Sequence, residues 1–461
     1  MTQVANDLAK HQWSIQPQAA VLVQELIDEF LRRCPEATRF ADRLLTETGT
    51  RFNDWVEAIV DPFILDRHTA ANRLREVGYE LDPQFKVWRH PQAMFPIINL
   101  VDAPKTFVML KVESVVDFLA ANGLADGRRI EEPPLAHSRH VFEVFGGDKA
   151  AMGVVERNGG LFEKTHHEAD PATILRVGEM FRLRRRKFDS ERQGFEHAMS
   201  LVDEAKKLVG VSRACRLFFA GERGYWMSRN KAARVQYARQ QALGMGWANH
   251  DHHTYRSSRE CFKDLVAVLE NLGLICRERF YAGREAGWGA QVMENPHAGI
   301  VVFADVDLNP EEVTGDFSHA PLPPRKQLGT VGLWCKLHGE AFLQAGMHHL
   351  ECQFDFNAAR EQLKKEGVSS MKPFTDFDYL KQAFTEGEVW AVDPKRVEAA
   401  LREGFITAEQ ADKFRREGAL GSHLEVLQRD DGYKGFNQTG ISEIIRKTDP
   451  RYAGVGQVRG A

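Results

Sequence analysis

One sequence pattern occurs twice in the second half of this 461-residue chain, and no other feature limits the possible folds as strongly. In residues 249–273 a pair of adjacent histidines lies in a short β-compatible stretch, a helical pattern follows, and Gly273 stands where that helix should end. Residues 346–368 repeat this order and close at Gly367. The interval from the second histidine to the glycine is 20 residues in the first copy and 18 in the second. We therefore expect one structural unit to be used twice.

Further strands are predicted after each copy. Residues 275–281, 288–295 and 298–306 follow the first helix as three apolar stretches separated by Gly, Asn and Pro. That order, strand, helix and three strands, is a βαβββ unit. After the second helix, two further capped helices in residues 393–418 precede the strand 422–430. The second unit is thus predicted to carry a helical insertion.

Strand parity determines which side chains of these units can meet, because alternate residues of a strand point to the same face of the sheet. In the first strand, one face is predicted to hold four residues: His250, His252, Thr254 and Arg256. In the second strand, one face is predicted to hold Met347, His349 and Glu351. In the last strand, Glu425 lies between Leu424 and Val426, which point to the opposite face. Glu425 is therefore a carboxylate in an otherwise apolar strand.

This carboxylate suggests what the site holds. Burying an ionised carboxylate is expensive unless a cation compensates it, and a divalent metal bound by two imidazoles would do so. His252, His349 and Glu425 have the composition of a two-histidine, one-carboxylate facial site, which leaves positions open for substrate and oxygen on non-haem Fe(II). The register of each histidine pair is fixed only to within one residue, so His253 and His348 are alternative ligands.

The same residues carry a resemblance to known proteins. Paired βαβββ units with a histidine on each first strand and a glutamate on the last resemble the vicinal-oxygen-chelate superfamily. The segment 423–440, "HLEVLQRDDGYKGFNQTG", is similar to the C-terminal metal-ligand segment of 4-hydroxyphenylpyruvate dioxygenases. A closer resemblance is to the 2-oxoadipate dioxygenase/decarboxylase (2-hydroxyglutarate synthase) family, where an arginine follows the metal histidine by four residues, as Arg256 follows His252.

The resemblance implies a fold, a reaction and a cofactor. The fold would be α+β, with paired βαβββ units forming a curved mixed sheet around the metal. Fe(II) would bind a small 2-oxo acid and O₂ for oxidative decarboxylation and hydroxylation, and Arg256 would hold a substrate carboxylate. Zn, Mn or Ni are the alternative metals, for an isomerase, a lyase or an extradiol dioxygenase. A non-catalytic protein that binds a small molecule is the remaining alternative.

The chain is expected to divide into three regions. Residues 1–210 form a mixed α/β region that holds a degenerate βαβββ unit without ligands, plus helices, among them a basic helix over 182–210 whose arginines face water. Residues 211–320 form the first metal-binding unit, and residues 321–461 form the second. The first histidine of the 2-oxoadipate dioxygenase family lies near the N-terminus, so the long leading region here departs from that family's pattern.

Composition and charge limit the binding partners and the cellular compartment that we expect for this protein. The formal net charge of −4 gives no global field that favours nucleic acid or an anionic membrane, so a small polar substrate is expected. Six scattered cysteines show neither a disulfide framework nor zinc-site spacing, and no apolar run reaches the length of a membrane span. A cytoplasmic protein is therefore expected. The sequence does not predict an oligomeric state.

Overall fold

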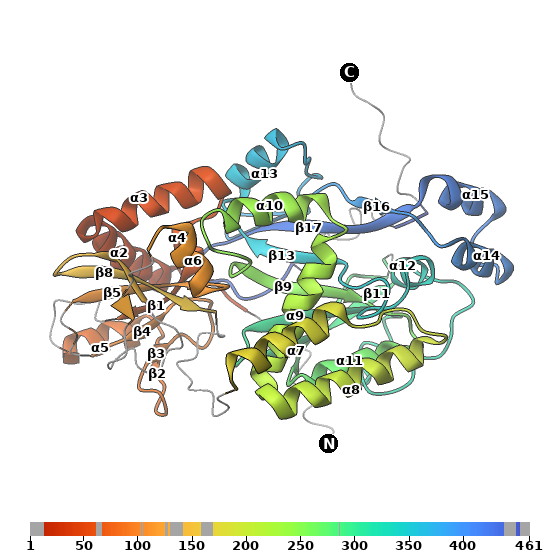
Figure 1. Ribbon diagram of the computed structural model, residues 1–461, viewed down its shortest axis with the longest axis horizontal. Coiled ribbons are helices and arrows are strands. Elements are labelled where there is room, and N and C mark those ends of the chain that lie inside the picture. Colours follow the sequence, from red (N-terminus) through yellow and green to blue (C-terminus); the bar gives the residue numbers. More distant parts are fainter. Residues whose placement is uncertain are drawn as a thin grey trace.

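The computed structural model describes residues 13–60, 67–101, 103, 105–124, 128–129, 142–157, 169–284, 286–437 and 449–451. Two sheets and the helices that cover them make up these parts of the chain (Figure 1). None of the helices in these ranges combines the length and the apolar character needed to span a membrane.

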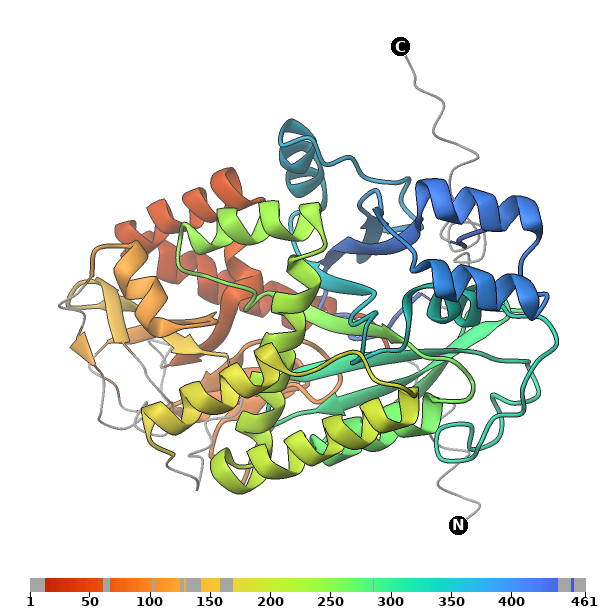
Figure 2. The same ribbon diagram turned by 45° about the vertical axis from the view of Figure 1, so that its right-hand side comes forward.

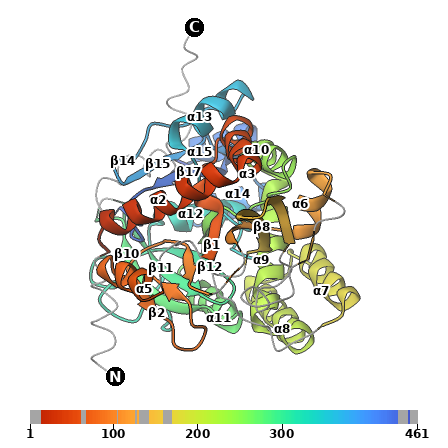
Figure 3. The ribbon, with the colours of Figure 1, turned by 90° about the vertical axis from the view of Figure 1, so that its left-hand side faces the viewer.

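In the described part of the chain, the first sheet has eight strands. They are β1 (Val56–Val60), β2 (Glu80–Leu81), β3 (Trp88–Arg89), β4 (Ile97–Asn99), β5 (Thr106–Val112), β6 (Arg128–Arg129), β7 (Phe142–Gly146) and β8 (Ala150–Glu156). Their spatial order is β2-β3-β4-β1-β5-β8-β7-β6. The accompanying helices are α2 (Pro17–Arg33), α3 (Pro35–Arg43), the π-helical turn η1 (Leu44–Thr48), α4 (Phe52–Trp55), α5 (Arg67–Glu76) and α6 (Val115–Ala121). Helices α2 and α3 pack their apolar faces against this sheet (Figure 3).

Between the two sheets, the described residues form four helices: α7 (Pro171–Leu183), α8 (Glu191–Val209), α9 (Val211–Met227) and α10 (Lys231–Gln241). The predicted basic helix over 182–210 is wrong in its first part, because α7 ends at Leu183 and α8 starts only after the cap residue Ser190. The prediction that its arginines face water is wrong for Arg184 and Arg186, whereas Arg185 is exposed as predicted. Arg184 and Arg186 are buried and contact the Glu222 carboxylate of α9 at 2.7 Å and 2.6 Å.

The second sheet has nine strands among the residues that the structure describes. They are β9 (His250–Arg256), β10 (Ile275–Tyr281), β11 (Trp288–Asn295), β12 (Ile300–Asp307), β13 (His349–Gln353), β14 (Thr375–Phe377), β15 (Leu380–Phe384), β16 (Glu388–Trp390) and β17 (Ala419–Arg429). The main path is β10-β11-β12-β9-β13-β17-β15-β14, with β16 paired to β17. Its helices are α11 (Phe262–Asn271), α12 (Thr330–His338), α13 (Phe356–Lys365), α14 (Pro394–Arg402) and α15 (Ala408–Glu417). Helices α14 and α15 form the predicted insertion, at the end of the molecule away from the first sheet (Figures 1 and 2).

The two sheets share one topology. In each sheet, two strand–helix–three-strand units lie side by side, and their first strands pair in antiparallel fashion, β1 with β5 and β9 with β13. Within each unit, the first strand pairs in parallel with the last strand. The expected α+β fold of paired βαβββ units is therefore confirmed. The sequence predicted only the β5–β8 unit of the first sheet, and the structure adds the β1–β4 unit.

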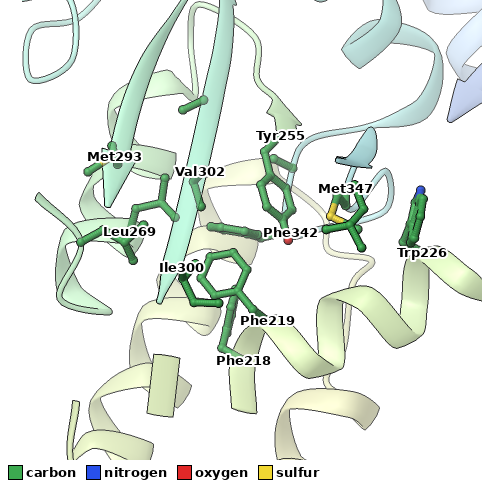
Figure 4. Close-up of a cluster of buried hydrophobic side chains, with 14 of the residues drawn as sticks. Phe218, Phe219, Trp226, Tyr255, Leu269, Met293, Ile300, Val302, Phe342 and Met347 are labelled. Atoms are coloured by element: carbon green, nitrogen blue, oxygen red, sulfur yellow. The ribbon is translucent and has the colours of Figure 1, made fainter. Parts of the chain in front are cut away.

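The largest apolar core lies on one face of the second sheet. Phe218 and Phe219 of α9 meet Tyr255 of β9 and Phe342, and the Phe218 and Phe342 rings contact edge to face at a centroid distance of 4.9 Å (Figure 4). Helices α7 to α11 cover this face with apolar side chains. His252 of β9, Glu351 of β13 and Glu425 of β17 lie together on the opposite face of the sheet, outside this core.

Candidate metal centre

Three adjacent strands bring the predicted ligands together. His252 lies on β9, His349 begins β13 and Glu425 lies on β17, and these strands are neighbours in the order β9-β13-β17. One ligand atom of each residue lies within 4.8 Å of the others. All three side chains are buried, with exposed fractions of 4%, 8% and 2%. The geometry therefore allows all three residues to share one ion.

A fourth residue, Glu351, lies at the middle of this group. On the central strand β13 it is registered with His252 on one side and with Glu425 on the other. Its Oε2 lies 3.4 Å from Nε2 of His252, while Oε2 of Glu425 lies 3.2 Å from Nε2 of His349. Gln382 of β15 donates from Nε2 to Oε1 of Glu425 at 3.0 Å. Two carboxyl groups and two imidazoles thus converge on one point.

Burial controls the protonation of this group. Desolvation raises the pKa of Glu425 to about 7. The pKa of Glu351 is raised well above its usual range, first by burial and then by the neighbouring Glu425. Burial also lowers the pKa of His349 far below its usual range, assisted by the charge of His252. A divalent cation binds a neutral imidazole and ionised carboxylates, so its charge would offset the desolvation that raises the pKa values of Glu351 and Glu425.

Unpartnered polar atoms provide an independent test of this fit. Nδ1 of His349, Oε1 of Glu351 and Oε1 of Gln382 are buried and make no hydrogen bond among the described residues. Buried polar atoms are normally hydrogen-bonded, so such a concentration indicates a missing partner. A nitrogen and oxygen donor set of this kind fits a divalent cation such as Fe(II), Mn or Zn.

Asp251 orients one of the histidines. Its Oδ1 lies 3.3 Å from Nδ1 of His252, which leaves Nε2 of His252 facing the centre. Arg429 donates from Nε to Oδ2 of Asp251 at 3.1 Å. Burial would raise the pKa of Asp251, but Arg429 and His252 outweigh that effect and hold the pKa well below its usual range. An ionised carboxylate at Nδ1 fixes the tautomer of a metal-binding histidine.

The structure also places the alternative histidines. His253 points to the opposite face, with Nε2 3.2 Å from Nη1 of Arg223 and its ring 4.9 Å from Phe219. His348 is adjacent to the centre, but its Nδ1 donates to the carbonyl of Gly421 at 3.0 Å. Its Nε2 lies 3.2 Å from Nε2 of His423. His252 and His349 are therefore the members of the two pairs that face Glu425.

Two parity predictions are wrong. His250 does not share a face with His252, because the pairing of β9 with β13 shifts register between Glu351 and Cys352, and the His250 ring packs against His253 at 4.8 Å. Met347 precedes β13 and is buried in the core on the opposite face from His349. The same register shift brings Asp251 beside His252, which simple alternation would have placed on the other side.

Arg256 lies at the end of β9, beyond the ligands. Its guanidinium is buried and lies 5.6 Å from the centroid of the Trp334 ring, and its Nε and Nη1 have no hydrogen-bond partner among the described residues. Asp305 is registered beside it on β12, and burial raises the pKa of Asp305 to about 8 against the opposing charge of Arg256. The structure thus does not place Arg256 among the ligands. It leaves this arginine with unused donors on the strand that carries His252.

Aromatic side chains enclose the imidazoles. The His252 ring contacts Phe303 at a centroid distance of 4.3 Å and Phe436 at 5.6 Å, and the His349 ring contacts Phe384 at 5.2 Å. These rings exclude water from the centre and strengthen the electrostatic interactions inside it. The neighbouring Cys352 is buried with a raised pKa, as expected for a small apolar packing residue.

Sequence reasoning did not assign roles to Glu351, Asp251 or Gln382. The spacing His349-x-Glu351 on one strand was a usable signal, because it places both side chains on one face. Asp251 and Gln382 reach the site through a register shift and through a neighbouring strand, and neither of these is visible in a local pattern.

Comparison with known proteins gives distant structural likenesses. No protein-family model matches the chain, and no curated protein matches it. A glyoxalase superfamily protein from Ralstonia eutropha is 15% identical, with a TM-score of 0.32, over 48% of this chain and 83% of its own. A mutant 4-hydroxymandelate synthase from Streptomyces coelicolor is 11% identical, with a TM-score of 0.29, over 87% and 99%. Methylmalonyl-CoA epimerase from Mycobacterium tuberculosis is 12% identical, with a TM-score of 0.23, over 40% and 88%. At these values, a functional proposal must rest on the site itself.

Proposed function

We propose that this chain is a non-haem Fe(II)-dependent dioxygenase that acts on a small 2-oxo acid, with His252, His349 and Glu425 as the metal ligands. The observation that carries the proposal is the convergence of two imidazoles and one carboxylate from three neighbouring strands within 4.8 Å. Three protein ligands on one side of an ion leave its other positions open, which is the arrangement that an oxygenase centre needs.

The metal would supply the open positions at which a 2-oxo acid and O₂ meet for oxidative decarboxylation and hydroxylation. The chain's own residues prepare the site for that chemistry. Asp251 holds the proton on Nδ1 of His252, so Nε2 presents its lone pair to the centre. Phe303, Phe384 and Phe436 keep water away from the imidazoles.

Arg256 has the role of binding a substrate carboxylate in this proposal. Its Nε and Nη1 donors are unused, and its planar guanidinium can hold a carboxylate through two parallel hydrogen bonds. Arg256 follows His252 by four positions, which corresponds to about 13 Å along a strand.

The test combines metal analysis with oxygen uptake. Wild-type protein should bind one Fe(II) per chain, and the variants His252→Ala, His349→Ala and Glu425→Ala should each lose it. The matched control is His253→Gln, which changes the adjacent histidine on the opposite face and should keep the metal. Each protein is then assayed for oxygen consumption with a panel of 2-oxo acids, where only the metal-binding proteins should respond.

Two outcomes would contradict the proposal. If His253→Gln loses iron while His252→Ala keeps it, the ligand assignment is wrong. If the wild-type protein binds iron at the predicted residues but consumes no oxygen with any 2-oxo acid, the dioxygenase reaction is wrong. In that case the centre serves an isomerase, lyase or other metal-dependent reaction.

A further inference from the structure

A cavity of about 740 Å³ lies between the two sheets, outside the candidate metal centre. The first sheet contributes Lys111 and the nearby Arg157 to its wall, and the second sheet contributes Asp251 and Arg429. The remaining wall is partly apolar, with side chains such as Phe95. A volume of this size accommodates a small organic molecule.

Lys111 faces this cavity without a partner. It lies on β5, and its ammonium makes no hydrogen bond or ion pair to any described residue. Burial lowers its pKa, and the charge of Arg157 lowers it further. A buried ammonium is costly unless an anion or hydrogen-bond acceptors compensate it.

Arg157 is a second cation with unused donors. It follows β8 and donates from Nη1 to the carbonyls of Ala248 and His250, and from Nη2 to the carbonyl of Gly299. These bonds use three of the five N–H groups of a guanidinium, and Arg157 forms no ion pair with a described carboxylate. Burial lowers its pKa to about 10.

The acidic residues around these two cations are mostly engaged elsewhere. Asp54 pairs with Arg51 at 2.8 Å, and Asp251 pairs with Arg429 at 3.1 Å. Glu57 on β1 lines the cavity but makes no ion pair with a described residue, so its attraction acts only at longer range. Two like charges are therefore held near each other in a half-buried wall, and no carboxylate of the described residues contacts either of them.

We propose that the cavity between the sheets is a binding site for a small organic carboxylate, held by Lys111 and Arg157. A carboxylate supplies one negative charge and two acceptor oxygens, which matches an ammonium beside two free guanidinium N–H groups. The apolar part of the wall, including Phe95, Val301 and Phe436, favours an organic anion over an inorganic one. Glu57 opposes a ligand with a second negative charge.

This site is separate from the metal centre but shares a wall with it. Asp251 and Arg429 line the cavity, and Asp251 also contacts Nδ1 of His252. This proposal does not depend on the dioxygenase function, because Lys111, Arg157 and the cavity that they line do not require a bound metal. It can therefore be tested on the metal-free protein.

The experiment measures binding of benzoate to metal-free protein by isothermal titration calorimetry. Benzoate has an apolar body, one carboxylate and no 2-oxo group with which to chelate a metal. Lys111→Met keeps the length of the side chain and removes its charge, and Lys111→Arg keeps the charge. Lys149→Met removes an exposed lysine of the turn between β7 and β8. Glu425→Gln alters the metal centre and leaves the cavity wall intact.

We expect the wild type and the two controls, Lys149→Met and Glu425→Gln, to bind benzoate with equal affinity. Lys111→Met should bind it at least about tenfold more weakly. Lys111→Arg should retain most of the affinity. Benzoate should also raise the melting temperature of the wild type but not of Lys111→Met. Equal binding by Lys111→Met, a loss confined to Glu425→Gln, or no binding by the wild type would overturn the proposal. Thermal unfolding of each variant confirms that it is folded.

Discussion

At the scale of single residues, Asp305 shows how a buried acid can respond to pH. Its Oδ1 has no hydrogen-bond partner among the described residues, and burial raises its pKa from 3.8 to about 8. Because the folded-state pKa lies above the unfolded value, folding favours the protonated acid. Its contribution to stability is intact below about pH 4 and declines as the pH rises toward 8.

We predict that Asp305→Asn, which imitates the protonated form, removes much of this pH dependence. Each unit of pKa shift corresponds to about 1.4 kcal/mol of unfolding free energy. Between about pH 5 and pH 8, the free energy of unfolding of the wild type should therefore fall by up to about 4 kcal/mol more than that of the variant. Chemical denaturation of the metal-free proteins measures this difference. Asp376→Asn, at an exposed position of β14, is the control. Parallel pH profiles for wild type and Asp305→Asn would refute the prediction.

Arg256 leads to a second prediction at this scale. Lysine keeps the charge but lacks the planar pair of donors, so Arg256→Lys should raise KM for the 2-oxo acid by about tenfold or more and should leave the metal content unchanged. Steady-state oxygen uptake provides the measurement. Arg192→Lys, an exposed change on α8, should have wild-type kinetics. An unchanged KM for Arg256→Lys would mean that the guanidinium does not hold the substrate.

At the scale of elements, the helices and longer strands could be predicted from local patterns. The strands β10 and β11 coincide with the predicted residues 275–281 and 288–295, and Gly273 and Gly367 take the positive φ angles that end a helix. The spacing of Ser257 and Glu260 predicts a capping box, but Ser257 does not cap α11. Ser257 donates to Glu340 instead, and α11 begins later, at Phe262. At Ser257, a tertiary hydrogen bond takes the place of the local capping interaction that the sequence pattern predicts.

The unpredicted elements have a physical reason in common. Strands β2 and β3 contain two residues each, which is too short for alternation to appear in the sequence. Their existence depends on pairing with each other and with β4, and that pairing is a tertiary property. The candidate ligands could be predicted because each lies within a longer strand, whereas Asp251 reached the site through a register shift.

Strand β17 provides a prediction about close packing. A Cβ added at Gly421 would lie 2.0 Å from the Trp390 ring of β16, and the Gly421 carbonyl accepts hydrogen bonds from Trp334 and His348. Gly421→Ala should therefore lower the free energy of unfolding by about 1–3 kcal/mol. Gly224→Ala, inside α9 with no atom within 4 Å of the added Cβ, should raise it by up to about 1 kcal/mol. Chemical denaturation compares the two, and a harmless Gly421→Ala would contradict the packing argument.

At the scale of the whole molecule, the two sheets have the same topology but carry different side chains on their corresponding strands. In the first sheet, the face with Ala58, Met109 and Ala151 forms an apolar cluster. In the second sheet, the matching strands carry His252, His349 and Glu425. The backbone order is the same in both cases, so the difference in chemistry lies in the side chains of three strands. The shared fold brings three strands together, but the side chains on those strands determine whether a candidate metal site is present.

The two sheets are also joined by polar contacts that local sequence patterns could not reveal. Arg223 donates to Glu113 at 2.7 Å, the amide of Asp355 donates to the carbonyl of Gly49 at 2.9 Å, and Arg157 spans the sheets through three carbonyls. These links connect residues more than 90 positions apart in the sequence. We therefore expect the metal-free protein to unfold in one transition, with coincident curves from tryptophan fluorescence and circular dichroism.

Arg157 tests whether these links stabilise the whole molecule. Arg157→Met removes three hydrogen bonds from a charged donor to carbonyls of the second half, and each buried bond of this kind contributes about 1–3 kcal/mol. Although the variant also removes a buried charge, its free energy of unfolding should be lower than that of the wild type by at least about 2 kcal/mol. The unfolding curves from tryptophan fluorescence and circular dichroism should then no longer coincide. Arg39→Met, at an exposed position of α3, should change stability by less than about 0.5 kcal/mol. If Arg157→Met unfolds like Arg39→Met, the guanidinium bridge adds nothing to the stability of the assembled chain, and the apolar contacts and the other polar links hold the sheets together.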